Sequence, residues 1–211
     1  MTLSLTPHLL NSLYWITFIA VIVSSASGVL KAGFKKFDLF GVIIIAIATG
    51  LGGGSLRDML LDREVFWIRD QIFFIASLGS AIAMFLIARI IVIPVRFFLI
   101  PDAAGLATFG VAGTLVSLMV GAPWLVASFM GVMTGTMGGI FRDVLSSETP
   151  VVFHSPLYAT VSWIGSLLLI ALLFLQLDVT IASIIAGVFI FSTRMLALRY
   201  NITLPKFTFK S

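Results

Sequence analysis

Long apolar runs without a charged side chain divide the chain into a series of predicted helices. The uncharged stretches are Leu9–Leu30, Leu39–Leu56, Gln71–Ala88, Ala103–Phe141, Ser155–Leu177 and Val179–Thr193. A helix that spans a bilayer needs about 20 residues, so Ala103–Phe141 predicts two helices, divided at Gly121-Ala122-Pro123. Val179–Thr193 is short, but the long side chains of Arg194 and Arg199 can reach the headgroups and extend it. The pattern therefore predicts an all-α membrane protein with about seven transmembrane helices.

The composition agrees with lipid as the solvent. Hydrophobic residues make up 60% of the chain and charged residues 10%, and the mean hydropathy is +1.16, whereas a soluble domain carries about 25% charge. Cysteine is absent, and His8 and His154 are too far apart in sequence for a metal motif. We therefore expect no metal and no cofactor. The net charge of +4 sits in loops and the tail, which suits topology control rather than a nucleic-acid partner.

The basic residues predict an orientation. They lie at Lys31, Lys35 and Lys36, at Arg89 and Arg96, and at Arg199, Lys206 and Lys210. With seven spans these three groups fall on one side of the membrane, and the positive-inside rule makes that side the cytoplasm. The stretch Leu9–Leu30 has no basic region before it and is long enough to span, so we interpret it as a retained first helix. The expectation is a multi-pass protein of the cell inner membrane with its N-terminus outside and its C-terminus in the cytoplasm.

The chain contains an internal repeat. Gly50–Leu61 aligns with Gly135–Ser146, and six of the twelve positions are identical, including Gly-Gly-x-x-Arg-Asp in both. The same offset aligns Gly28 with Gly113 and Ser77 with Ser162. We therefore predict one membrane domain over 1–211, with repeat one at about 9–93, repeat two at about 102–177 and a seventh helix at about 179–198. Because three helices per unit is odd, the second copy is expected to be inverted, as in transporters and some channels.

The repeated glycines have two possible roles. Glycine weakens a helix by about 1 kcal/mol relative to alanine, and broken backbone inside a membrane is tolerated where it lines a wet cavity. The alternative is close helix packing by small residues. We favour pore lining or hinging for the paired clusters, because packing alone does not require a charge pair after each. Gly28, Gly113, Gly165 and Gly187 are interpreted as packing residues, and faces such as Gly28 and Gly105–Gly113 offer surfaces for assembly of copies.

The charge pairs Arg57-Asp58 and Arg142-Asp143 also leave two alternatives. Neighbouring residues on a helix point about 100° apart, so each side chain is expected to meet a partner on another helix. The alternative is an interfacial cap with a snorkelling arginine. Asp38, Asp102 and Asp178 are expected to be ordinary helix starts.

The doubled motif, two three-helix units and a seventh helix resemble the prokaryotic trimeric intracellular cation (TRIC) channels, a bacterial family also labelled a "glycine transporter" domain. The resemblance implies a homotrimer with one pore per protomer, lined by helices 2 and 5 and conducting monovalent cations, chiefly potassium. By position it implies hinges at Gly52, Gly53, Gly54, Gly138 and Gly139. Animal members carry a lysine in helix 5 that is linked to lipid and voltage control, where this chain has Met133, Thr134 and Gly135. Ser55 and Thr134 are then the expected polar lining, with Gly135 beside them.

Two main classes of function stay open. The favoured one is a passive cation channel that conducts K+ and Na+. The other is a small-solute carrier, for example of a glycine-like molecule, working by alternating access. A purely structural protein is disfavoured by the paired glycines, and an enzyme is not expected, since the chain lacks an evident nucleophile–base set.

Overall fold

The computed structural model describes residues 7–35, 37–91 and 93–205, so three cations used to predict the orientation, Lys36, Lys206 and Lys210, lie outside the described residues. The long helices are α1 (Pro7–Ala32), α2 (Leu39–Leu60), α4 (Ile72–Ile90), α5 (Leu99–Met119), α6 (Trp124–Leu145), α8 (Ala159–Phe174) and α9 (Val179–Tyr200). Two four-residue helices, α3 (Phe66–Arg69) and α7 (Val151–His154), and two 3-10 turns, Gly33–Lys35 and Val95–Phe98, connect them.

Six of these helices are long and apolar enough to cross a membrane, and α8 is a shorter apolar helix. The predicted span Ser155–Leu177 is therefore too long, because the chain bends before α8, where Leu157 has a φ of 31°. The predicted division of Ala103–Phe141 is confirmed: Gly121 has a φ of 83° between α5 and α6, a conformation that favours glycine. The chain is an all-helical, multi-pass membrane protein.

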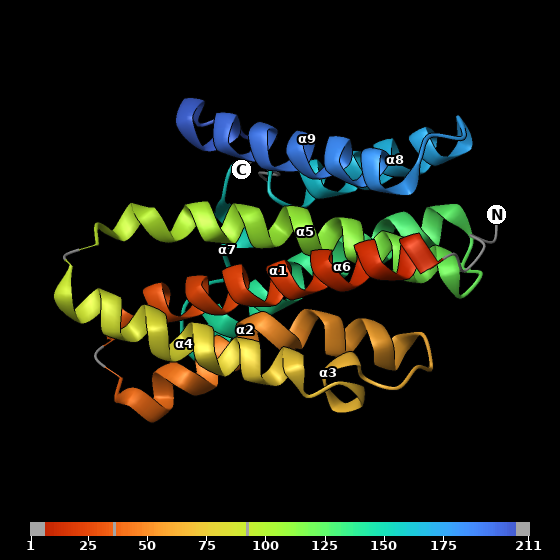
Figure 1. Ribbon diagram of the computed structural model, residues 1–211. Helices are drawn as coiled ribbons and strands as arrows, with labels where there is room; N and C mark the ends of the chain where they lie inside the picture. Colours follow the sequence, from red (N-terminus) through yellow and green to blue (C-terminus); the bar gives the residue numbers. More distant parts are fainter. Residues whose placement is uncertain (1–6, 36, 92, 206–211) are drawn as a thin grey trace.

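The helices run along roughly parallel axes, with α5 and α1 in the middle of the bundle (Figure 1). On one side α5 packs against α8 and α9, and on the other α1 packs against α2 and α4. α6 contacts both α5 and α2. Most side chains of α5 are buried, whereas only a minority of those of α4 and α9 are. The periphery of the bundle thus offers apolar surface to lipid or to another copy.

Small residues let the central helices approach closely. A Cβ atom at Gly28 would lie 2.9 Å from Cα of Ala46 on α2, and one at Gly113 would lie 3.0 Å from the carbonyl oxygen of Met130 on α6. Gly105 likewise faces Ser24 of α1. The expectation that these faces serve assembly of copies was wrong, because they are used for packing inside one protomer.

The offset that aligns the two Gly-Gly-x-x-Arg-Asp motifs also relates the observed elements. When this offset is added to the first and last residues of α2 and α3, it gives the first and last residues of α6 and α7. The similarity in sequence therefore extends to where these helices begin and end.

Candidate functional site

The two glycine clusters meet where α2 and α6 pack against each other. A Cβ atom at Gly53 would overlap the carbonyl oxygen of Thr134, and one at Gly138 would overlap the carbonyl oxygen of Thr49. Thr49 and Thr134 occupy equivalent positions in the repeat. The contact is thus reciprocal: each helix places a glycine against the backbone of the other. No larger residue fits at either position without separating the helices.

Both helices remain α-helical through their glycines. The helices are therefore not broken at these glycines in this conformation. Glycine lowers the stability of a helix in isolation, but here the close approach of two backbones adds packing that a side chain would prevent. The glycines therefore act first as a close contact between α2 and α6.

The remaining glycines of the site face side chains or a neighbouring backbone. Gly52 lies against the ring of Phe141 and Gly54 against the ring of Phe66. A Cβ atom at Gly135 would lie 2.9 Å from the carbonyl oxygen of Leu106, and one at Gly139 would lie 3.4 Å from the hydroxyl of Tyr158. Gly139 thus borders the polar cluster formed around Arg142.

The hydroxyls of Ser55 and Thr134 point to different neighbours. Ser55 Oγ donates to the carbonyl of Leu51 at 2.8 Å and accepts from Nε1 of Trp67 at 2.8 Å. Thr134 Oγ1 donates to the carbonyl of Met130 at 2.7 Å and is buried against Gly113. The structure does not bring these two side chains together as a shared lining.

Arg57 and Asp58 are buried and paired with each other. Their exposed fractions are 2% and 1%. Nε and Nη2 of Arg57 lie 2.9 and 2.8 Å from Oδ1 of Asp58, and Oδ2 of Asp58 accepts from the backbone N–H of Phe66 at 2.9 Å. The carboxylate therefore holds both the arginine and the first residue of α3.

Arg142 and Asp143 repeat this arrangement and extend it. Arg142 Nε lies 2.9 Å from Oδ1 of Asp143, whose Oδ2 accepts from the backbone N–H of Val151 at 2.8 Å. In addition, Nη1 of Arg142 donates to Oδ1 of Asp102 at 2.6 Å and to Oγ of Ser27 at 2.9 Å. This arginine has two carboxylate partners.

The expectation that these side chains meet partners on other helices is confirmed for Arg142, which binds Asp102 of α5, and for Asp58 and Asp143, which bind the first backbone N–H of α3 and of α7. The arginine and aspartate of each motif also pair with each other, which was not expected. The alternative of a snorkelling arginine does not fit, because Arg57 and Arg142 are buried. One expectation about the other carboxylates was wrong. Asp102 is not a helix cap, because its carboxylate binds Arg142; Asp38 and Asp178, in contrast, do cap α2 and α9.

Sequence reasoning missed Arg194 as a buried polar residue. It does not snorkel: its side chain is fully buried, with Nη2 donating to Oγ of Ser155 at 2.7 Å and Nη1 to the carbonyl of Pro156. Its guanidinium lies 4.5 Å from the ring centroid of Tyr158. The sequence does indicate that Arg194 lies inside the helix and not at its end, because apolar residues continue after it.

A partly exposed ion cluster joins two chain segments at one end of the bundle. Glu148, just after α6, lies 2.5 Å from Lys31 and 3.0 Å from Lys35. Hydrogen bonding by Lys31, and less by Lys35, lowers the pKa of Glu148 against the opposing effect of burial. The end of α1 is thereby linked to the end of α6.

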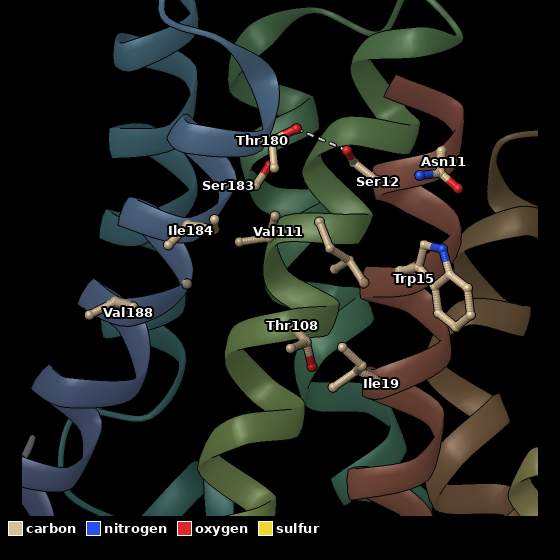
Figure 2. Close-up of a pocket in the computed structure, with 12 residues that line it drawn as sticks. Asn11, Ser12, Trp15, Ile19, Thr108, Val111, Thr180, Ser183, Ile184 and Val188 are labelled. Carbon is tan, nitrogen blue, oxygen red and sulfur yellow. Dashed lines mark hydrogen bonds between the residues drawn. The ribbon is translucent and has the colours of Figure 1, made fainter. Parts of the chain in front are cut away.

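Two of the cavities among the described residues lie on different sides of the bundle. A groove of about 460 Å³ opens between α1, α5 and α9, and Figure 2 shows Trp15 and Ile19 facing Ile184 and Val188 across it, with a 2.9 Å hydrogen bond between Ser12 and Thr180. It contains none of the predicted site residues. A second, more polar pocket of about 270 Å³ reaches Arg57. This pocket therefore adjoins the candidate site.

Comparison with known sequences gives consistent relatives. The family model described as "Glycine transporter" matches the chain twice, over residues 14–89 and 99–174. The UPF0126 inner membrane protein YadS of Escherichia coli K12 is 35% identical over 197 residues, which cover 92% of this chain and 95% of that protein. A UPF0126 membrane protein of Vibrio cholerae is 39% identical over 204 residues, covering 92% and 82%.

Solved structures extend the likeness to three dimensions. The TRIC trimeric intracellular cation channel orthologue from Rhodobacter sphaeroides superposes with a TM-score of 0.86 at 32% identity, over 90% of this chain and 98% of that one. A second TRIC cation channel gives a TM-score of 0.83 at 27% identity, over 93% and 97%. From the doubled motif, the doubled family match and the shared fold, the chain belongs to the glycine transporter family, which is the family of the TRIC channels.

Proposed function

We propose that this protein is a cation channel of the cell inner membrane, a homotrimer in which each protomer holds its own potassium-preferring pore. The observation that carries the proposal is the likeness, over nearly the whole of both chains, to a channel described as trimeric and cation-conducting. The relative named as an inner membrane protein supports the location. The N-terminus is then outside and the C-terminus in the cytoplasm, as the distribution of basic residues along the sequence favours.

The pore of each protomer lies along the contact of α2 and α6. The reciprocal approach of Gly53 and Gly138 supports an inverted repeat, because a half-turn about an axis in the membrane plane exchanges the two contacts. With the backbones touching there, this point is the constriction of a closed state, and conduction requires the helices to separate. In the separated state the proposed lining and hinge residues are Gly52, Gly53, Gly54, Ser55, Thr134, Gly135, Gly138 and Gly139; in the closed state Ser55 and Thr134 face different neighbours.

The buried charge pairs stand at the two ends of this path. Arg57 and Arg142 each bind the carboxylate that follows them, so their charge is locally compensated and opposes cation entry less than a free arginine would. A path between the separated helices that carries no ring of carboxylates gives modest selectivity among monovalent cations. This is the chemistry expected of a potassium-preferring pathway with residual sodium conductance.

Recording from purified protein in planar bilayers tests the proposal. We expect stepwise unitary currents in potassium chloride and a reversal potential that follows the potassium gradient. Saturable counterflow of a small solute without unitary currents would instead identify a carrier. The oligomer is tested separately by cross-linking in native membranes, where products that stop at the dimer would contradict the trimer.

A further inference from the structure

The polar pocket beside Arg57 is rich in cationic side chains. It lies between α1, α3, α4 and α5, and Arg57, Arg63 and Arg69 line it together with Glu64 and Asp70. Glu64 is exposed, and Oδ1 of Asp70 accepts from the backbone N–H of Ile72 at 3.0 Å. Of the three arginines, Arg57 is buried, Arg63 is half-buried and Arg69 is exposed.

Two arginine nitrogens in this pocket have no internal acceptor. Among the described residues, Nη1 of Arg57 and Nη1 of Arg63 are buried and lack a hydrogen-bond partner. Arg57 is only 2% exposed, and its Nε and Nη2 already use Asp58. An unsatisfied buried donor costs about 1–3 kcal/mol, and more when it is charged, so an acceptor from outside the chain would be favourable.

The second repeat shows what satisfies an arginine in this position. Nη1 of Arg142 is bound by Asp102, which precedes it by 40 residues. Thr17 precedes Arg57 by the same interval and lines the pocket. The first repeat thus has a short neutral side chain and an open pocket where the second has a carboxylate.

We propose that this pocket binds an oxyanion, a phosphate or carboxylate group, whose oxygens accept hydrogen bonds from Nη1 of Arg57 and Nη1 of Arg63. The volume of about 270 Å³ accommodates such a group, and guanidinium groups suit planar or tetrahedral oxyanions. The oxyanion belongs either to a dissolved ion or to the headgroup of an anionic phospholipid. It takes the place that Asp102 takes beside Arg142.

Two variants test the site without relying on channel activity. Thr17→Asp supplies an internal carboxylate to Arg57, and Arg63→Gln removes one donor while leaving the arginine–aspartate pair intact. Arg199→Gln, which changes an exposed arginine at the end of α9, is the matched control. Inorganic phosphate binding is measured by calorimetry on trimer in non-ionic detergent. Native mass spectrometry after exchange into phosphatidylglycerol or phosphatidylcholine nanodiscs measures lipid retention.

Phosphate binding that weakens by about tenfold or more in both variants, but not in Arg199→Gln, supports a site for a dissolved oxyanion. A headgroup site is supported if the parent and Arg199→Gln retain phosphatidylglycerol whereas Thr17→Asp and Arg63→Gln lose it. Absence of both kinds of binding in the parent, or equal binding in parent and Thr17→Asp, overturns the proposal. Should Thr17→Asp fail to fold, Arg63→Gln alone decides by the same criteria. A channel that conducts but binds no oxyanion would refute this site and leave the proposed function standing.

Discussion

Asp102 on α5 and Arg142 on α6 form a buried ion pair with 2.6 Å between Oδ1 and Nη1, and both side chains are at most 6% exposed. This pair joins two helices at one end of the bundle. The ring of Phe98 lies 5.5 Å from the same guanidinium and closes the cluster from another side.

Asp102→Ala should destabilise the protein by about 1–3 kcal/mol, because Nη1 of Arg142 loses its carboxylate acceptor while the pair of Arg142 with Asp143 remains. Thermal unfolding of the purified protein in detergent measures the effect. Asp38→Asn is the matched control, since Asp38 is an exposed helix cap and asparagine caps almost as well. Similar unfolding temperatures for Asp102→Ala and the parent would contradict a structural role for the pair.

Gly53→Ala should hold α2 and α6 apart. The added methyl group overlaps the carbonyl of Thr134, and overpacking of this kind costs about 1–3 kcal/mol. We expect a lower unfolding temperature together with a higher open probability in single-channel recordings. Gly79→Ala on α4 is the control, because a Cβ atom there meets nothing within 4 Å; it should leave the currents unchanged and the stability equal or slightly higher. If the Gly53→Ala protein has currents and stability like those of the parent, the proposal that conduction requires α2 and α6 to separate at this contact is wrong.

Glu148 should make stability depend on acid pH. Its pKa is lower in the folded protein than the ordinary 4.5, because Lys31 and Lys35 stabilise the carboxylate. The stabilisation is complete above the unfolded pKa and is lost as the pH falls through the lower folded pKa. Since the group is partly exposed, the effect is about 1 kcal/mol or less. The difference in unfolding temperature between the parent and Glu148→Gln should shrink on acidification from pH 7 to below 4; a difference that stays constant would argue against the cluster.

A reporter fused after Ser211 should be active only in the cytoplasm. The prediction rests on the three groups of basic residues that seven spans place on one side of the membrane, and on the positive-inside rule. A reporter that is active only outside the cytoplasm refutes this orientation. The same reporter placed after Asp62, between α2 and α3, should give the opposite result and serves as the internal control.

Apolar runs and the repeated motif predicted the long helices, apart from the extent of α8, and the equivalence of the two glycine clusters. A bilayer fixes the length of a spanning segment, and a repeated sequence fixes equivalent positions, so both can be derived without coordinates. The short helices α3 and α7 were missed because four residues carry no periodic signal. They begin where a backbone N–H meets Asp58 or Asp143, and such a contact depends on how the chain turns after the preceding helix.

The partners of the buried charges could not be predicted for a related reason. Helical periodicity gives the direction of Cα–Cβ bonds, but an arginine has enough freedom to reach the carboxylate of the next residue, as Arg57 does. Asp102 precedes an apolar run, which resembles a cap in sequence. Only the packing of α5 against α6 brings it to Arg142.

The double use of each aspartate has a mechanical consequence. Asp58 fastens Arg57 of α2 to the start of α3, and Asp143 fastens Arg142 of α6 to the start of α7. We therefore expect each long helix and the short helix after it to move together as one rigid body. A change of distance at the Gly53–Gly138 contact then moves the short helices on both faces of the membrane. Conversely, a ligand that binds to either short helix changes the separation of α2 and α6 at this contact.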